Sequence, residues 1–324
     1  MTSKYTVAIL GGSRFIGHAI AEGLLARGHR LITVNRGISR AAYAGAVKRV
    51  FADRREPDSY HAALKRLDAD WVVDVTAYCA EDTKVAADAF RGRVKGFVHI
   101  SSMSVYRWPF PCPVPEESPL ETDAANAYGF HKAECERVLD SVSNAGFPCT
   151  VLRLPAVFGP GDPFSRERYL MGNLLQGLPV MVPEKPFLVQ NIFSLDVAEA
   201  VCRLIERGRD RPGCAYNLGG PAFALEEYLE LLGSFAGVEP LMIRSPDQAL
   251  RLAGVNTSRL PYFFDGDLVM DTTRIANETG FEARSSLDRE ALSLTVRWIL
   301  EHQQPIVYWG LPWEHPVDPA ALQR

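Results

Sequence analysis

The sequence lacks the features that mark most nucleic-acid-binding and membrane proteins. No run of Lys or Arg is dense enough to follow a phosphate backbone, and the formal net charge is −4. Neither nucleic acid nor an anionic membrane surface is therefore the expected partner. No stretch approaches the roughly 20 apolar residues that cross a bilayer. The short apolar segment Tyr5–Leu10 leads directly into glycines and is too short for a signal peptide, so we expect a cytoplasmic protein.

Patterns that would indicate a metal site are also missing. The six cysteines include no C-x-x-C pair, and the seven histidines are dispersed without H-E-x-x-H spacing. We therefore expect no metal ion. The cysteines are expected to be scattered buried thiols in a reducing compartment.

The first half of the chain alternates short β-branched runs with amphipathic stretches. This alternation predicts right-handed βαβ units and a parallel sheet. The predicted strands are Tyr5–Leu10, Leu31–Asn35, Val47–Ala52, Trp71–Thr76, Gly96–Ser101 and Cys149–Leu154. The predicted helices are Ser13–Arg27, Glu81–Arg91 and Ala125–Asn144. The fold class is therefore α/β, a Rossmann-like doubly wound sheet whose ligands bind at the carboxyl ends of the strands.

The alternation weakens after about residue 160, where Pro and Gly recur. Two short runs, Val189–Leu195 and Ala215–Leu218, are predicted to return to the sheet, and Leu225–Ala236 and Ser286–Glu301 to be helices. The stretch Gln304–Arg324 is predicted to be irregular. We expect a dinucleotide-binding domain over 1–160 with returning segments at about 189–220, and a smaller substrate-binding lobe from 161–188 and 221–324.

A glycine loop follows the first predicted strand. It comprises Gly11, Gly12, Ser13, Arg14, Phe15, Ile16 and Gly17 and opens the first helix. Glycines let the backbone turn and approach a pyrophosphate closely, and the helix N-terminus offers free N–H groups to the phosphates. A strand before and a helix after the loop favour dinucleotide binding over an ordinary βα turn.

Three positions bear on the adenosine end of such a cofactor. Arg14 stands where a middle glycine is usual, and Asn35-Arg36 ends the second strand where an acidic residue would bind both ribose hydroxyls. Arg can pair with a 2′-phosphate, so these residues favour NADP(H), with NAD(H) still possible because Asn also binds a ribose. A solvent-exposed Arg14 without a ligand is the alternative. Asp53 is predicted to accept from the adenine amino group or, equally, to serve a turn. Thr76, at the end of the fourth strand, is also expected at the cofactor.

Ser102, Tyr128 and Lys132 form a candidate catalytic set. Positions 128 and 132 lie on one face of a helix, and Ser102 follows the fifth strand. Tyr has a reference pKa of about 10, and a neighbouring ammonium lowers it, so Tyr128 can exchange a proton with an alcohol or carbonyl while hydride moves. Ser102 can hydrogen-bond the substrate oxygen.

Together these segments resemble the extended short-chain dehydrogenase/reductase family, also called the NAD-dependent epimerase/dehydratase family. The resemblance spans nearly the whole chain. It includes Gly11–Gly17, Ser101–Tyr106, Pro115-Glu116-Glu117, Tyr128–Lys132, Arg153–Gly161, Asn191–Val201 and Asn217–Gly220.

The resemblance implies roles for several residues. Gly11, Gly12 and Gly17 would hold the pyrophosphate, and Lys132 would also contact the nicotinamide ribose. Pro155 to Val157 would line the nicotinamide pocket, and Asp196 looks like the usual start of a helix. A homodimer through Glu81–Arg91 and Ala125–Asn144 is possible by the same resemblance.

Some positions depart from the family pattern. Met103-Ser104 replaces the Asp-Glu pair of the dehydratases, and Gln190 replaces an Arg usual in nucleotide-sugar enzymes. A ketoreductase or an epimerase acting on a sugar nucleotide or another polar small molecule is expected. The Arg14 variant also resembles a branch with plastid stem-loop RNA-binding proteins, so a non-catalytic cofactor- or RNA-binding protein is the alternative. Substrate choice is expected from Phe110–Leu120, Pro163–Lys185 and Asn256–Asp265.

Overall fold

The computed structural model describes residues 3–39, 41–164, 166–208, 213–252, 257, 260–262, 266–284, 287–302, 306–308 and 311–313. The chain divides into two compact units. Unit 1 comprises Met1–Pro155, Ser194–Gly219 and Met270–Glu282, and unit 2 comprises Ala156–Phe193, Gly220–Val269 and Ala283–Arg324. Each unit is therefore assembled from segments far apart in the sequence.

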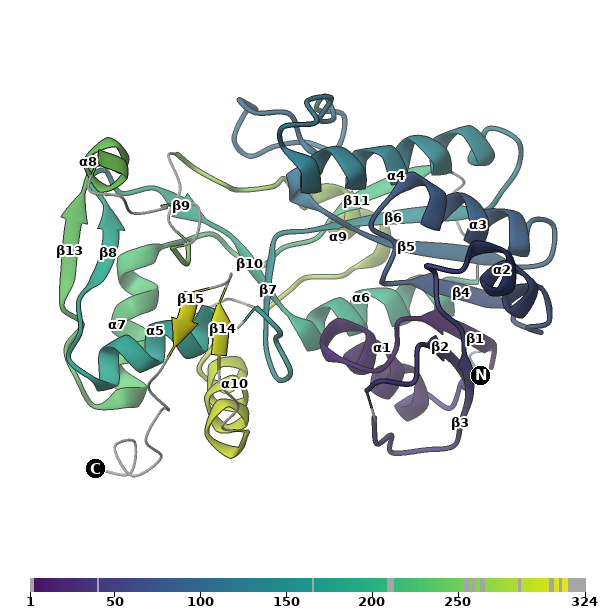
Figure 1. Ribbon diagram of the computed structural model, residues 1–324, viewed down its shortest axis with the longest axis horizontal. Coiled ribbons are helices and arrows are strands. Elements are labelled where there is room, and N and C mark those ends of the chain that lie inside the picture. The colour runs from purple at the N-terminus through teal and green to yellow at the C-terminus, as the bar shows by residue number, and fades with distance from the viewer. Residues whose placement is uncertain are drawn as a thin grey trace. The chain divides into compact units, whose positions relative to one another are not determined.

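Unit 1 is built on a seven-stranded parallel sheet with the order β11-β6-β5-β4-β1-β2-β3 (Figure 1). Its strands are β1 (Thr6–Leu10), β2 (Arg30–Asn35), β3 (Val47–Phe51), β4 (Trp71–Asp74), β5 (Gly96–Ser102), β6 (Cys149–Leu154) and β11 (Cys214–Asn217). The sheet confirms the predicted α/β fold class. The order reverses between β1 and β4, and ligands of such sheets bind at the carboxyl ends of the strands beside this point.

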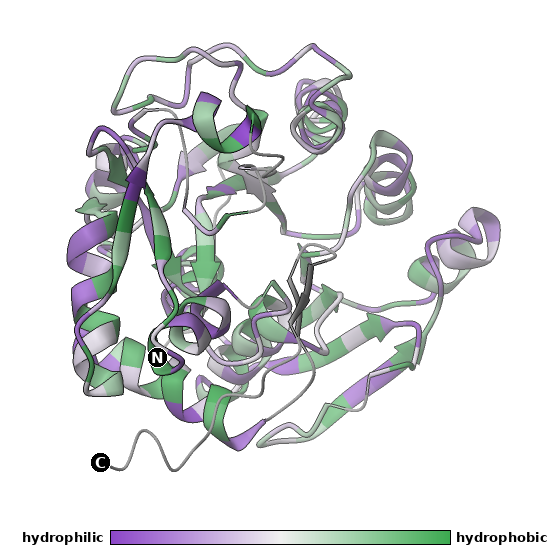
Figure 2. Cartoon of the chain, turned by 60° about the vertical axis from the view of Figure 1, so that its left-hand side comes forward, coloured by the Kyte–Doolittle hydropathy of each residue, from purple (hydrophilic) through white to green (hydrophobic). Residues whose placement is uncertain are grey.

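Helices cover both faces of this sheet. One face carries α1 (Phe15–Ala26) packed beside α6 (Ser194–Arg207), and the other carries α2 (Pro57–Lys65), α3 (Ala80–Phe90) and α4 (Ala127–Ser143) (Figure 1). The helices carry both hydrophobic and hydrophilic segments, as Figure 2 shows. The central strands have both faces covered, so β1, β4 and β6 are buried along most or all of their length. The remaining elements of unit 1 are the 3₁₀ turn η1 (Met103–Val105) and α9 (Thr273–Thr279).

Among its described residues, unit 2 contains helices and four small two-stranded sheets around its own apolar core. Its helices are α5 (Arg166–Leu175), α7 (Leu225–Ala236), α8 (Asp247–Leu252) and α10 (Arg289–Glu301). Its strands are β7 (Ala156–Phe158), β8 (Val180–Pro183), β9 (Leu188–Val189), β10 (Asn191–Phe193), β12 (Phe223–Ala224), β13 (Met242–Ser245), β14 (Ile306–Tyr308) and β15 (Leu311–Trp313). The strand pairs are β7 with β10, β9 with β12, β8 with β13 and β14 with β15.

Two predictions of local structure were wrong. The run Val189–Leu195 does not return to the main sheet: it contains the end of β9 and all of β10, and turns into α6 at Ser194. The stretch from Gln304 is not irregular throughout, because β14 and β15 pair as antiparallel strands. Its remaining residues lie outside the described part of the chain.

Candidate functional site

The glycine loop makes the tight turn that its composition predicts. Gly11 has φ +100°, and a side chain there would strike the Thr76 γ-methyl, since a Cβ would lie 2.2 Å from it. A Cβ on Gly17 would lie 2.2 Å from the Gly11 carbonyl oxygen. Both positions therefore require glycine, and the loop, including Gly12, Ser13 and Ile16, folds back on the carboxyl ends of β1 and β4.

The start of α1 is prepared to receive an anion. Arg14, at the N-cap, has no side-chain capping bond, and the first turn contains no acidic residue. By contrast, α2 and α3 each begin with acidic residues. The first-turn N–H groups of a helix lack intrahelical partners and attract phosphate. Phe15, the first residue of α1, has φ 45°, a left-handed backbone conformation that is unusual for a residue other than glycine. The residues present thus fit the pyrophosphate of a dinucleotide.

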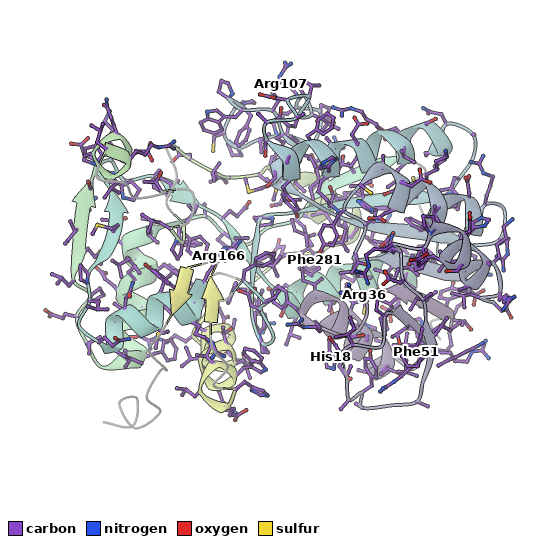
Figure 3. The ribbon with its side chains drawn as sticks, in the orientation of Figure 1. His18, Arg36, Phe51, Arg107, Arg166 and Phe281 are labelled. Carbon is purple, nitrogen blue, oxygen red and sulfur yellow. The ribbon has the colours of Figure 1, made fainter. Side chains whose placement is uncertain are left out.

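The predicted ribose residues lie at the end of β2. The Asn35 side-chain oxygen accepts the Gly37 N–H at 2.9 Å, which leaves its amide NH₂ for a ligand. Arg14 and Arg36 are both exposed. Figure 3 shows the position of the Arg36 side chain, and that of His18 of α1. The two guanidinium groups are therefore available to an anionic ligand.

Tyr43 was not predicted, and it contacts the glycine loop directly. Its hydroxyl donates to the Gly12 carbonyl at 2.9 Å, and its ring stacks on His18 with centroids 5.4 Å apart. The Arg49 guanidinium covers the Tyr43 ring at 5.3 Å from the centroid. The β2–β3 connection thereby braces the loop. A lone Tyr in a loop gives no sequence signal of this contact.

Asp53 lies just beyond β3 and is already paired. Its carboxylate accepts from the Arg55 side chain, with the shortest bond 2.6 Å, and from the Arg55 backbone N–H at 3.1 Å. These bonds lower the pKa of Asp53 to about 2. Asp53 therefore stabilises the local turn, as the second interpretation predicts. An adenine amino group could bind Asp53 only by sharing its carboxylate with Arg55.

Gly129 lets α4, the helix that carries Tyr128, pack closely against the turn that follows Ser102. Ser102 ends β5, and its hydroxyl oxygen accepts the Ser104 N–H at 3.2 Å. A Cβ on Gly129 would lie 2.2 Å from the Ser104 carbonyl oxygen. Only glycine therefore lets α4 pack this closely against η1, and Tyr128 is its immediate neighbour. Asn126 caps the helix by accepting the Gly129 N–H at 3.4 Å.

Tyr128 and Lys132 lie one turn apart on α4 but differ in environment. The Tyr128 side chain is 51% exposed, and Lys132 is 3% exposed. The Lys132 Nζ donates to the Ala77 carbonyl at 2.9 Å and to the Ile100 carbonyl at 2.7 Å, and lies 3.3 Å from His99 Nε2. Burial lowers the pKa of the Lys132 ammonium, while nearby Asp74 raises it. A buried cation thus lies beneath an accessible phenol.

A buried ion pair that the sequence analysis did not predict lies close to Lys132 and the glycine loop. Arg54, in the β3–α2 loop, binds the Asp74 carboxylate and donates to the Thr76 hydroxyl at 3.2 Å. Thr76 in turn touches Gly11, so Arg54 links the carboxyl end of β4 to the glycine loop. Thr76 thus lies at the glycine loop, as predicted for a cofactor residue, and its hydroxyl already bonds to Arg54 and the Leu10 carbonyl.

A buried network anchors the strand ends around Ser102. Arg153 of β6 makes bonds of 2.6–3.2 Å to Glu136 of α4, and donates to the Tyr106 hydroxyl at 2.9 Å and the Glu116 carbonyl at 2.7 Å. The Glu136 carboxylate also accepts from the Ser101 hydroxyl at 2.5 Å. These bonds hold β5, β6 and α4 in register beside the candidate site.

The remaining predicted positions lie in different parts of the structure. Pro155 closes a segment of unit 1, and Val157 lies in β7 of unit 2; both are buried. Asp196 lies in the first turn of α6, as predicted. The Gln190 amide donates to the Gly220 carbonyl at 2.8 Å within unit 2. Most of Asn256–Asp265 lies outside the described residues.

No helix in the described part of the chain is long and apolar enough to cross a membrane. No three His, Cys, Asp or Glu side chains in the same residues gather as ligands of a metal ion would.

Comparisons with known proteins agree with this geometry. The solved structure of the Bordetella bronchiseptica enzyme WbmG in complex with NAD is 18% identical, covers 91% of this chain and 94% of its own, and has a TM-score of 0.73. The UDP-glucose 4-epimerase from Bifidobacterium longum in complex with NAD⁺ and UDP is 20% identical over 90% of this chain and 97% of its own, with a TM-score of 0.72. These likenesses support the fold.

A curated relative and a family model match the sequence itself. The chloroplast stem-loop binding protein of 41 kDa b from Arabidopsis thaliana is 25% identical over 220 residues, which are 63% of this chain and 56% of that protein. The match therefore spans little more than half of the relative's length. The model of the NAD dependent epimerase/dehydratase family matches residues 7–219. The chain belongs to the NAD dependent epimerase/dehydratase family.

Proposed function

We propose that this enzyme transfers hydride between a nicotinamide cofactor and a secondary alcohol or ketone of a polar small molecule, with Tyr128 as the acid and base. One observation carries the proposal: the accessible Tyr128 phenol lies one helical turn from the buried Lys132 ammonium. A cation at this position favours the phenolate and so brings the Tyr128 pKa toward neutral pH. The bound cofactor would supply or accept the hydride.

The other steps of the proposed reaction are assigned to residues of the chain. The Ser102 oxygen accepts from Ser104, so its O–H can be donated to the substrate oxygen. Tyr128 takes a proton from an alcohol during oxidation and returns one to a carbonyl during reduction. Lys132 stabilises the phenolate electrostatically. Gly11, Gly12 and Gly17, with the first turn of α1, would hold the pyrophosphate. Pro155 and Val157 would line the nicotinamide pocket.

The substrate is proposed to be a polar, hydroxylated metabolite. Met103 and Ser104 replace the acidic pair of dehydratases, which disfavours removal of water. Gln190 stands where nucleotide-sugar enzymes have an Arg, and its amide is bonded to the Gly220 carbonyl. We therefore place simple oxidation or reduction slightly ahead of sugar or nucleotide-sugar epimerisation. The segments proposed to choose the substrate are Phe110–Leu120, Pro163–Lys185 and Asn256–Asp265.

NADP(H) is proposed as the preferred cofactor. Arg14 and Arg36 are exposed, and no acidic side chain ends β2 to repel a 2′-phosphate. Arg14→Ala should weaken NADPH binding by about tenfold, the loss of one charge-assisted contact, and leave NADH binding within about twofold. Titration followed by nicotinamide fluorescence measures both constants. Arg91→Ala is the control, because Arg91 pairs with Asp88 at the surface and has no proposed role at the cofactor. Equal losses for both cofactors would remove Arg14 from this role.

The central test is Tyr128→Phe. The variant should lose about 10²–10⁴-fold in turnover, the usual contribution of a positioned acid or base, with NADPH affinity nearly unchanged. Steady-state kinetics with a panel of ketones and keto sugars, preceded by cofactor titration, makes the comparison. Phe130→Leu on the same helix is the control for folding. Full turnover in Tyr128→Phe would contradict the proposed mechanism.

The similarity to the Arabidopsis stem-loop binding protein favours one second candidate, a non-catalytic cofactor- or RNA-binding role. The net charge of −4 and the presence of Ser102, Tyr128 and Lys132 weigh against it. Salt-dependent binding of a stem-loop RNA, with no binding of either nicotinamide cofactor, would favour this candidate. A homodimer through α3 and α4 stays a prediction that light scattering can test.

A further inference from the structure

The Lys132 ammonium has three N–H groups and three acceptors around it. Two are the backbone carbonyls of Ala77 and Ile100, and the third is His99 Nε2 at 3.3 Å. An ammonium can donate three hydrogen bonds and no more. Each of the three donors therefore has an acceptor among the described residues, and His99 supplies the only side-chain acceptor of the three.

His99 is a neutral acceptor in this position. It lies on β5 with 0% exposure, and burial, together with the charges of Lys132 and Arg54, holds its pKa well below the ordinary value. A neutral imidazole carries one proton, and the Nε2 that faces an ammonium must be the bare nitrogen. The proton therefore resides on Nδ1, which has no hydrogen-bond partner among the described residues. An orphan buried donor costs stability. The contact with Lys132 is the only one of the two ring nitrogens' hydrogen bonds that is made among the described residues.

We propose that His99 is a positioning residue of the candidate site, whose Nε2 completes the coordination of the Lys132 ammonium and holds that charge one helical turn from Tyr128. The proposal rests on the proposed function and adds a residue to it. His99 does not touch the reacting atoms. It acts through Lys132: removal of its acceptor would leave a buried ammonium N–H unpaired and favour the neutral amine, which no longer stabilises the Tyr128 phenolate.

Other ionisable groups surround this cluster and would contribute to its titration. Asp74 is fully buried and bonded to Arg54, and burial raises its pKa. The Tyr78 ring centroid lies 6.0 Å from Lys132 Nζ. The groups that act electrostatically on Lys132 are Cys135, Asp74, Glu136 and Arg54, and those that act on His99 are Lys132 and Arg54. Tyr60 and Asp82 act in turn on Arg54, and Cys79 acts on Cys135. His99→Gln and His99→Met leave all of these groups in place, so a difference between those two variants reports on His99.

The test compares two side chains of equal length at position 99. His99→Gln keeps an acceptor where Nε2 lies, and His99→Met removes it. Tyrosine labelled with ¹³C at Cζ reports ionisation of each phenol by NMR, and Tyr128→Phe assigns the Tyr128 signal. In the protein without cofactor, His99→Met should raise the midpoint of Tyr128 ionisation by about one pH unit, equivalent to one hydrogen bond to a charged group. His99→Gln should stay within about 0.3 unit of the wild type.

The pH profile of turnover should follow the same order. The acidic limb for alcohol oxidation should move upward by about one unit in His99→Met and remain in place in His99→Gln. An unchanged Tyr128 titration in folded His99→Met would overturn the proposal. If His99→Met does not fold, His99→Asn, whose amide is too short to reach Lys132 Nζ, takes its place with the same expectation.

Lys132→Met separates this inference from the proposed function. It should shift the Tyr128 titration by more than His99→Met does, because it removes the whole charge. If Lys132→Met leaves Tyr128 unmoved, the coupling of Tyr128 to Lys132 fails, and both proposals fail with it. If Lys132→Met shifts Tyr128 and His99→Met does not, only the role of His99 is refuted.

Discussion

In unit 1 the buried Arg153 lies against the carboxylate of Glu136, whereas in unit 2 the buried Asp162 lies near a second carboxylate, that of Glu167. The first pair has opposite charges, and the Glu136 charge raises the Arg153 pKa still further. The second pair has like charges, and burial together with the Glu167 charge raises the pKa of Asp162 to about 7. Unit 1 thus buries ionised groups, while unit 2 holds a carboxyl group that is partly protonated near neutral pH.

The neighbouring charges explain why the two cases differ. In unit 2, Glu167 accepts from the hydroxyls of Tyr228 at 3.0 Å and Tyr262 at 2.7 Å. Asp162 accepts the backbone N–H groups of Phe164, at 2.8 Å, and of Arg166, and its Oδ2 has no partner among the described residues. These bonds favour the Asp162 carboxylate, but burial and the Glu167 charge outweigh them, so the pKa of Asp162 rises. The comparison teaches that the sign of the neighbouring charge, as well as burial, decides whether a buried group keeps its charge.

The largest expected effect comes from unpairing the unit 1 network. Arg153→Met leaves Glu136 buried without its cation, and the free energy of unfolding should fall by about 3–5 kcal/mol. Urea denaturation at pH 7 measures the loss. Arg91→Met is the control, because Arg91 pairs with Asp88 at the surface and should cost below about 1 kcal/mol. A loss as small as that of the control would show that the buried pair is not structurally required.

The next effect concerns the pH dependence of unit 2. A carboxyl whose folded pKa lies above its unfolded value near 3.8 loses stability as pH rises between the two values. The wild type should therefore lose stability from about pH 4 to about pH 7 through Asp162. Asp162→Asn should remove this slope and be more stable at pH 8 by on the order of 2 kcal/mol.

Asp271 of unit 1 provides the opposite control for that experiment. Bonds from Thr273 lower its pKa, so its contribution is present at neutral pH and is lost only as pH falls below the ordinary range. Asp271→Asn should leave the slope between pH 5 and 7 as it is in the wild type. Thermal unfolding over this pH range tests both variants, and a wild-type slope in Asp162→Asn would refute the assignment.

The smallest effect distinguishes the two tyrosines that solvate Glu167. Tyr262→Phe removes the shorter bond and Tyr228→Phe the longer one. Each should cost about 1–3 kcal/mol, typical of a hydrogen bond to a charged group, with Tyr262→Phe the costlier. Chemical denaturation of the two variants gives the order. A reversed order would show that the distance to Glu167 does not govern its stabilisation.

Much of unit 1 could be predicted because its signals are local. All six strands predicted in the first half are present within two residues at each end. Five of them carry apolar runs that are largely buried, while β3 is mostly exposed. Helix α2 was missed because only Tyr60 and Leu64 of its nine residues are buried, which leaves little periodicity. The break between β10 and α6 was missed because Ile192 and Phe193 continue an apolar run into the helix.

In the candidate site, too, the features formed by neighbouring residues were predicted and the contacts between distant residues were not. The glycine loop and the Tyr128–Lys132 spacing can be read from neighbouring residues, and their functional roles stay predictions. The contacts of Lys132 with His99, of Arg54 with Asp74 and of Tyr43 with Gly12 join residues 20 to 33 positions apart. Such contacts depend on which strands become neighbours, and no pattern along the chain records that.

The packing of α1 against α6 has a consequence for how the protein is made. The buried side of α1 lies against helix residues such as Ala198 and Cys202, which leave the ribosome long after the glycine loop. The edge strand β11 is made later still. During synthesis, therefore, the N-terminal βαβ units exist for some time with an uncovered apolar helix face and an open sheet edge. Chaperones bind exposed surfaces of this kind. For the same reason, a fragment cut near residue 160 would not be a self-sufficient nucleotide-binding module.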